Sequence, residues 1–590
     1  MLKWGTGCMK IVGEIKNIYR ETIKEHFASA AVFMLAMLIY AVNCGGTFNS
    51  FYNGILGDIL NGSAFSLIGL SLGILLCEAF YLYKKNSDSQ YKPFNAKTTA
   101  FYIIASLVAV LAFGQNYVVV NTDFVKEYLG DKSTLYTGLS ADIFVFTLIT
   151  LLCLSVFFFY KRSNENFEGY AAKAFCSLMK AELVYAIIAI GSALIVFAFD
   201  ELIFDTYRLN LSERVQILLI GLVQFPCAVM ALSRTKDSIS QFGKIVLTYV
   251  LTILESIAFV IIYVYIIKIL ITWKFPSNEA FSILTGLFAA GIMIWTMALG
   301  CSQGFIRKYI RIMPFIYIPF IILQGMCLYM RVSEYGFTKS RYMGLALIVF
   351  EIVYFGIYTY RFFSEKDIIS SVLFVIIIAA FIMLFFPKIN MYSVVTASQR
   401  AVIEKCFKLG DDADNTLKSR AYEAFHAIKK DGGFAGNKYL EKKLSDEQID
   451  ILRSYSDISD DSSSDTFYVY SDRNVDKIDV SDYDELYYIN KNYGSFYDES
   501  LDLNYDLEML PLYNGDEVIG IVNLKPLADK FIELDKKDLS MESEHASELI
   551  NEPVELMDGG ILIISGLDFR GDYYDADCIK YIDLRGYVLK

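Results

Sequence analysis

The sequence predicts a polytopic α-helical membrane bundle followed by a soluble α+β C-terminal domain. About eleven apolar runs, each long enough to cross a bilayer as a helix, fill the first two-thirds of the chain and stop at Pro387. The rest is polar, acidic and rich in Tyr, Asp and Ser. Hydrophobic residues make up 55% of the 590 residues, which is more than a soluble protein of this size carries. One polypeptide is therefore divided between lipid and water.

Each apolar run is interpreted as one transmembrane helix, because only helices and closed barrels satisfy their backbone groups within lipid. The predicted spans cover residues 27–44, 64–83, 99–119, 142–160, 174–199, 215–232, 245–272, 280–300, 312–330, 342–362 and 368–386. The membrane domain is thus predicted over residues 27–387. A basic, amphipathic segment, residues 1–26, precedes it without a small-residue cleavage site, so we expect the first span to be an uncleaved anchor.

The Lys and Arg residues of the short loops set the expected orientation. With the N-terminus inside, the inside segments hold about 20 Lys and Arg residues and the outside loops about 9. An odd number of spans then places the tail outside. We expect a multi-pass protein of the plasma membrane with a cytoplasmic N-terminus and an extracytoplasmic C-terminal domain. One missed or false span would reverse the side of the tail.

The tail is expected to contain three parts. Residues 388–457 have the apolar spacing of juxtamembrane helices, residues 458–465 are an Asp- and Ser-rich linker, and residues 466–590 form a strand-rich soluble domain. The tail holds about 23 Lys and Arg residues against about 42 Asp and Glu residues, which argues against nucleic acid as a partner. Its two cysteines, Cys406 and Cys578, are either a disulfide pair or two separate buried thiols.

Polar residues inside the predicted spans are the first candidate site, because ionisable groups in lipid are costly and mark functional positions. Glu255 and Glu351 each lie roughly 15 Å from the end of a span, near the middle of a core about 30 Å thick. Such residues form either a shared polar cavity or interhelical hydrogen bonds that hold the bundle together. The candidate intramembrane polar site consists of Glu255, Glu351, Gln224, Gln324, Lys180 and Glu182.

A charged loop between the ninth and tenth predicted spans is the second candidate site. Residues 331–342 have the sequence RVSEYGFTKSRY, and the candidate residues are Arg331, Glu334, Tyr335, Arg341 and Tyr342. Such a loop can bind a headgroup or phosphate, anchor itself at the membrane interface, or dock the tail.

The same loop carries a family resemblance. A similar R-x-x-E-Y-G-h-T-x-x-R-Y pattern, where h is apolar, is found in the bacterial membrane family catalogued as domain of unknown function 4153, and the chain resembles that family. Lys339 stands where the family pattern leads us to expect an acidic residue. The resemblance implies a bacterial integral membrane protein of unassigned activity, and it supplies no catalytic residues.

The sequence carries little that enzyme chemistry requires. It has three His residues and no P-loop or HExxH motif, and we expect no metal and no cofactor. We expect instead binding or sensing of an envelope ligand, with membrane lipids and an envelope protein, glycan or peptide at the tail as partners. The alternatives are a transporter or lipid carrier with a midplane polar cavity, and a membrane-embedded transferase. The short first outside loop counts against the transferase.

Overall fold

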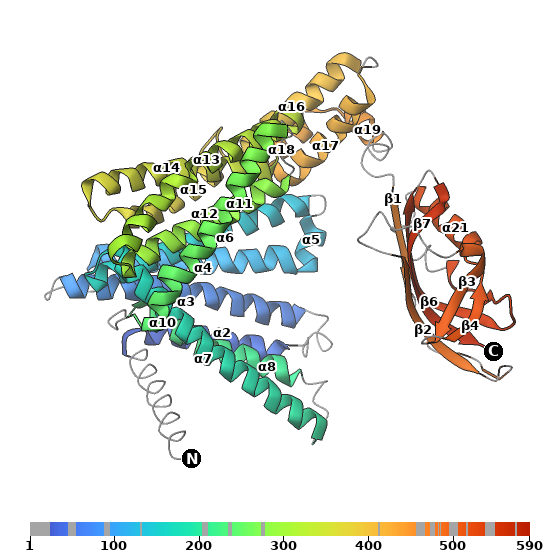
Figure 1. Ribbon diagram of the computed structural model, residues 1–590, viewed down its shortest axis with the longest axis horizontal. Coiled ribbons are helices and arrows are strands. Elements are labelled where there is room, and N and C mark those ends of the chain that lie inside the picture. Colours follow the sequence, from blue (N-terminus) through green and yellow to red (C-terminus); the bar gives the residue numbers. More distant parts are fainter. Residues whose placement is uncertain are drawn as a thin grey trace. The chain divides into compact units, whose positions relative to one another are not determined.

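The computed structural model describes most of the chain, and Figure 1 traces its helices and strands. The described residues are 24–44, 55–87, 95–129, 132–202, 210–233, 239–272, 278–410, 413–455, 466–472, 478, 480–481, 483, 485–494, 506–514, 517–536, 549–572 and 575–590. The predicted segment 1–26, apart from its last three residues, and the predicted linker 458–465 lie outside them. The side chain of Cys578 is also outside the description, while Cys406 is buried.

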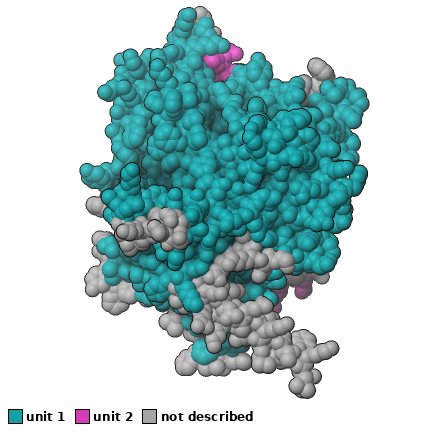
Figure 2. All heavy atoms as spheres, turned by 90° about the vertical axis from the view of Figure 1, so that its left-hand side faces the viewer, with its two compact units in different colours: residues 1–411, 423–449 teal, residues 412–422, 450–590 magenta. Residues whose placement is uncertain are grey.

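The chain divides into two compact units, which Figure 2 distinguishes by colour. Unit 1 comprises residues 1–411 and 423–449, and unit 2 comprises residues 412–422 and 450–590. Unit 1 contains the helices of the apolar part. It also contains most of the predicted juxtamembrane segment, so the compact unit extends well past Pro387.

Long helices build unit 1. In chain order they are α2 (Phe27–Asn43), α3 (Ile55–Ser87), α4 (Ala96–Asn121), the short α5 (Asp123–Leu129), α6 (Ser133–Ser163), α7 (Phe167–Leu202), α8 (Leu211–Leu219) continuing into α9 (Phe225–Ser233), α10 (Gln241–Ile245) continuing into α11 (Leu251–Thr272), α12 (Asn278–Cys301), α13 (Gly304–Tyr335), α14 (Lys339–Ser364) and α15 (Val372–Phe385).

Nine helices of the described chain are long and apolar enough to cross a membrane, which makes the chain a multi-pass membrane protein. They correspond to nine of the predicted spans. The other two predicted spans coincide with shorter apolar helices, Phe27–Asn43 and Ile369–Phe385. Several helices run past the predicted ends, as α3 does by nine residues before Ala64, because helical hydrogen bonding continues through polar residues.

Two of the bundle's helices contain a π-helical turn. One turn, Ile220–Gln224, joins α8 to α9 and ends directly before Phe225 and Pro226. The other, Val246–Val250, joins α10 to α11. Both turns lie next to polar residues that the sequence singles out, Gln224 and Glu255. π-Helical turns are rare and occur frequently at functional sites.

Four helices follow the bundle, namely α16 (Met391–Leu409), α17 (Asn415–Asp431), α18 (Gly433–Lys443) and α19 (Asp446–Arg453). The Ser445 hydroxyl accepts the Gln448 backbone N–H at 3.3 Å, and the Gln448 side chain accepts the Ser445 N–H at 3.1 Å. This reciprocal capping box explains why α19 begins where it does.

The strand-rich part of unit 2 is an antiparallel sheet with the strand order β1-β6-β7-β2, where β5 pairs with β6, and a separate β3–β4 hairpin. The strands are β1 (Thr466–Asp472), β2 (Leu486–Gly494), β3 (Leu510–Asn514), β4 (Glu517–Val522), β5 (Val554–Glu555), β6 (Ile561–Asp572) and β7 (Asp575–Leu589). Alternate residues of β7, such as Ile582 and Leu584, enter a core that also holds Phe531 of α21 (Lys525–Lys536). The predicted small sheet in the C-terminal region is confirmed.

Candidate functional site

The structure joins four of the six predicted intramembrane polar residues into two pairs. On α13, the Gln324 amide donates a hydrogen bond of 3.2 Å to Glu351 of α14, and both side chains are fully buried. The Gln224 amide donates a hydrogen bond of 3.0 Å to Glu182 of α7. These are interhelical hydrogen bonds of the kind that fixes helices against one another in lipid.

The other two predicted residues lie apart from these pairs. Lys180 is exposed at the surface of α7. Glu255 of α11 is buried, and neither of its carboxylate oxygens has a hydrogen bond of normal geometry in the described chain. A cavity shared by all six residues therefore stays a prediction, whereas the two hydrogen-bonded pairs are observed.

The predicted outer loop is folded against α16. Gly336 has a φ of +72°, and the amide of Gln399 on α16 donates hydrogen bonds to the carbonyls of Tyr335 at 3.2 Å and Phe337 at 2.7 Å. The Phe337 N–H is bonded to the Ser398 hydroxyl at 2.8 Å. The loop therefore docks the first helix of the tail, one of the three roles that the sequence left open.

Two of the candidate residues of the loop, Arg341 and Tyr342, stabilise the turn at Gly336 through contacts with the backbone. The Arg341 guanidinium donates to the Gly336 carbonyl at 3.0 Å and lies 5.2 Å from the centre of the Tyr335 ring. Tyr342 is buried and donates to the Ile389 carbonyl. Arg331 lies half-buried near the end of α13, and the Glu334 side chain lies outside the described part of the chain.

A charged pocket of about 330 Å³ lies at the start of α13 and the end of α14. These are the helix ends that lie away from the loop 331–342. Three separate segments build it: the start of α7, the junction of α12 with α13, and the end of α14 with the residues that follow. Four cationic side chains and three carboxylates dominate its lining. The lining residues are Asn166, Glu168, Leu299, Arg307, Arg311, Arg361, Glu365, Lys366 and Asp367.

Backbone contact and one ion pair hold the wall of this pocket. Gly300 near the end of α12 lies so close to α7 that a Cβ there would collide with the carbonyl oxygen of Glu168. The Glu168 side chain is buried and forms an ion pair with Arg361 of α14. Because a buried carboxylate needs a positively charged partner, Arg361 serves to neutralise Glu168 in the wall of the pocket.

The other carboxylates of the pocket also have partners. Asp367 accepts the Tyr160 hydroxyl at 2.8 Å and the Phe167 backbone N–H at 3.0 Å, so it caps the N-terminus of α7. Glu365 lies 3.6 Å from the Arg311 guanidinium and is largely exposed, which makes that pair weak.

Two cationic side chains of the pocket remain available to bind an anion. In the described chain the side chains of Arg307 and Lys366 form no hydrogen bond and no ion pair, and both are exposed to solvent at the pocket. Together with Arg311, they present donors and positive charge to an anion. Guanidinium groups bind phosphate and carboxylate groups through paired hydrogen bonds.

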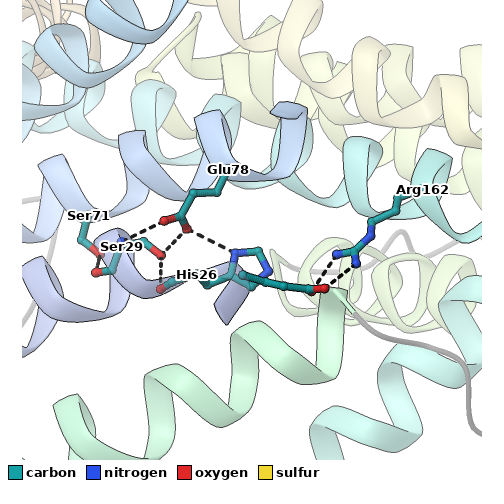
Figure 3. A network of polar contacts seen from close by, with 6 residues as sticks. His26, Ser29, Ser71, Glu78 and Arg162 are labelled. Carbon is teal, nitrogen blue, oxygen red and sulfur yellow. Dashed lines mark hydrogen bonds and ion pairs between the residues drawn. The ribbon is translucent and has the colours of Figure 1, made fainter. Parts of the chain in front are cut away.

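A second polar network joins α2 to α3 (Figure 3). Glu78 accepts hydrogen bonds from the Ser29 hydroxyl at 2.6 Å and the Ser29 N–H at 3.2 Å, and it lies 3.2 Å from the His26 Nδ1 atom. The Ser71 hydroxyl donates to the Ser29 carbonyl, and Arg162 forms two hydrogen bonds with Glu25. The network fixes the N-terminus of α2, where a carboxylate is stabilised by the helix dipole.

Sequence reasoning did not identify the charged pocket. It used Arg307 and Arg311 only as evidence for orientation, because their clustering fits a cytoplasmic loop. The available signal was the presence of a basic or acidic cluster in three loops predicted to share one side of the membrane. The spacing of residues within one loop cannot show that the charged clusters of three different loops meet in the folded protein.

Comparisons with known proteins agree with the resemblance seen in the loop. No curated protein and no solved structure matches the chain. A family model described as "Domain of unknown function (DUF4153)" matches residues 132–419, which include the charged pocket, the outer loop and α16. The match confirms the predicted family resemblance over these residues.

Proposed function

We propose that this protein is a membrane-embedded binding protein that holds a phosphate-type anion in the charged pocket. One observation carries the proposal: four cations line the pocket, and two of them, Arg307 and Lys366, form no ion pair or side-chain hydrogen bond in the described chain. The ion pair of the wall is formed by Arg361 and Glu168, and Arg307 acts on the Glu168 carboxylate only at longer range.

The chemistry of the pocket favours a phosphate over a cation or a neutral ligand. Arg307 and Arg311 follow each other by one helical turn on α13, so their guanidinium groups can approach one anion from the same side. Lys366 adds a point charge from the segment after α14. A phosphate group offers several oxygens to these donors, and such charge-assisted hydrogen bonds are among the stronger ones in proteins.

We further propose eleven spans, with the pocket on the cytoplasmic side of the plasma membrane. The short helix α15 is supported as a span by its contacts along α6. Asp367, just before α15, meets Tyr160 near one end of α6, and Phe385 at the end of α15 meets Phe146 in the middle of α6. Tyr392, a few residues beyond α15, meets Asp142 farther toward the other end. Since α6 is long enough to cross a membrane, a helix that follows it over this length crosses too.

The short helix α2 is supported in the same way by α3. Its first turn meets Glu78, and Asn43 at its end donates to the Gly57 carbonyl at 3.1 Å. Gly57 and Glu78 are separated by roughly 30 Å of helix, which is the thickness of a bilayer core. With eleven spans, all three segments of the pocket fall on the predicted cytoplasmic side and the tail falls outside, where an envelope protein, glycan or peptide is its proposed partner.

The proposal is tested by phosphate binding to the purified full chain in nanodiscs. We expect the wild type to bind inorganic phosphate, and the double variant R307A/K366A to bind it at least 10-fold more weakly, since hydrogen bonds to charged groups contribute about 1.5–3 kcal/mol each. K308A is the matched control, because Lys308 is an exposed cation on the same helix that does not line the pocket.

A lipid headgroup and a free phosphate share this chemistry, so the nanodisc lipid separates them. Retention of an anionic phospholipid by the wild type but not by R307A/K366A would identify a headgroup, whereas binding of inorganic phosphate in purely zwitterionic nanodiscs would identify a soluble ligand. Absence of both, or equal weakening by K308A, would overturn the proposal.

A further inference from the structure

Among the buried carboxylates of the described bundle, Glu255 differs from Glu168 and Glu351 in having no ion pair and no hydrogen bond of normal geometry. It lies in α11 with 3% of its surface exposed. Neither carboxylate oxygen accepts a hydrogen bond of normal geometry from a described residue, and the polar group that faces the carboxylate is the neutral indole N–H of Trp295. By contrast, Glu351 has a bond from Gln324, and Glu168 has an ion pair with Arg361. Glu78 accepts hydrogen bonds from two donors of Ser29.

The surroundings of Glu255 are aromatic and tightly packed. A Cβ placed at Gly291 of α12 would lie 2.9 Å from a Glu255 oxygen and 2.7 Å from the Trp295 ring, so both side chains crowd that glycine. Trp295 is fully buried and contacts Phe259, one turn beyond Glu255 on α11. From α14, Tyr354 is the titratable group that faces Glu255, and it too is buried.

The backbone next to Glu255 is irregular. The π-helical turn Val246–Val250 ends five residues before it. Within the next turn, the Thr252 hydroxyl donates to the Leu247 carbonyl at 3.3 Å, and the Ser256 hydroxyl donates to the Thr252 carbonyl at 2.6 Å. The nearby hydroxyls are therefore occupied with carbonyls. A π-helical turn beside a buried ionisable residue is an arrangement found at functional sites.

An ionised carboxylate in this place would be unpaired in an apolar interior, which costs several kcal/mol or more. The same group carrying a proton is a neutral acid and is far less costly to bury. We propose that Glu255 is an intramembrane proton-binding site, whose carboxyl group holds a proton at neutral pH and gives it up only when water or a polar partner reaches it. The inference does not depend on anion binding at the charged pocket.

A first experiment requires no variant. The purified wild-type chain in nanodiscs is treated at neutral pH with an apolar carbodiimide, which reacts with protonated carboxyl groups in lipid. The acid proton moves to a carbodiimide nitrogen while the carboxyl oxygen bonds to the central carbon, and the adduct rearranges to a stable N-acylurea. Peptide mapping is expected to place the adduct on Glu255. Recovery of that peptide unmodified, with other carboxyl groups modified, would contradict the proposal.

Infrared spectroscopy gives an independent readout. A protonated acid without a hydrogen bond has a carbonyl band above the amide band, and we expect the wild type to show it at neutral pH. E255Q should lose this component, E255D should keep it at a shifted position, and E182Q should leave it unchanged. If E255Q fails to fold, the comparison of E255D with the wild type replaces it, and a shifted carbonyl band in E255D would support the assignment. The same band in E255Q and the wild type would overturn the assignment.

Discussion

The Tyr392 hydroxyl donates a hydrogen bond of 2.8 Å to Asp142, although 250 residues separate the two in the sequence. Lys339 lies 2.8 Å from both oxygens of the same carboxylate. Burial, and then the hydrogen bond to Asp142, raise the pKa of Tyr392 above its ordinary value, so its hydroxyl stays a donor at neutral pH. Asp142 thus joins three segments, namely the start of a span, the outer loop and the first tail helix.

This contact between segments leads to a prediction about the side of the membrane on which the C-terminal tail lies. A protease-cleavable epitope placed after Lys590 should be lost when intact cells are treated with protease, because the proposed eleven spans would put Tyr392 and all that follows outside. The same epitope before Met1 is the control and should survive until the cells are lysed. A protected C-terminal epitope would mean that α2 or α15 does not cross the membrane.

Gly336 should be essential for docking α16. Its φ of +72° is strained for any other residue, and a Cβ there would lie 2.8 Å from the Ser398 hydroxyl. We expect G336A to lose about 1–3 kcal/mol of stability and to speed hydrogen exchange in residues 391–409.

Gly410 provides the control for Gly336. It also has a positive φ, of +56°, but a Cβ there would meet no atom within 4 Å. G410A therefore carries the backbone strain without the crowding. Equal exchange in the two variants would show that the contact with Ser398 contributes nothing to docking.

The apolar pattern predicts the bundle well because lipid imposes it. A run such as 142–160 has one stable structure in a bilayer, and the structure has α6 there. Helix ends are less predictable, since polar residues such as Lys84 and Lys85 extend α3 beyond its apolar run. Within the predicted helical segment 388–457, apolar spacing alone does not show that the chain breaks at Gly432 to begin the short helix α18.

The candidate sites were less predictable because they depend on contacts between distant segments. Depth along a span singles out Gln324 and Glu351, but it cannot show that they bond to each other while Glu255 has no such bond. Lys339 illustrates the same limit. Its departure from the family pattern left its charge pairing in doubt, and its partner is Asp142, almost 200 residues earlier.

Gly300 should control the geometry of the charged pocket. Any side chain there collides with the backbone at Glu168, so α7 and α12 must separate in G300A. We expect a loss of about 1–3 kcal/mol in thermal unfolding of the detergent-purified chain, with weaker phosphate binding. G286A, in the same helix with open space around it, should keep the stability and phosphate binding of the wild type. Similar loss in both variants would indicate that helix flexibility, and not the close approach, matters.

In unit 2, the C-terminal residue should stabilise the turn before β6 in a pH-dependent manner. Lys590 lies 2.6 Å from Asp558, whose other oxygen accepts the Ile521 N–H at 3.2 Å. The hydrogen bond from Lys590 is the main reason why the pKa of Asp558 lies below its ordinary 3.8. Because the folded pKa is the lower one, this contribution is complete above pH 3.8 and is lost as the pH falls through the folded value.

Hydrogen exchange in residues 555–565 of the full chain measures this effect, with rates corrected for the intrinsic exchange at each pH. We expect D558N to exchange faster than the wild type at pH 5, and the two to converge as the pH falls through the folded pKa of Asp558. The difference should be small, since the pair is partly exposed and screened by solvent. A gap that persists unchanged at the lower pH would show that D558N acts through packing, because protonation of Asp558 removes only the charge.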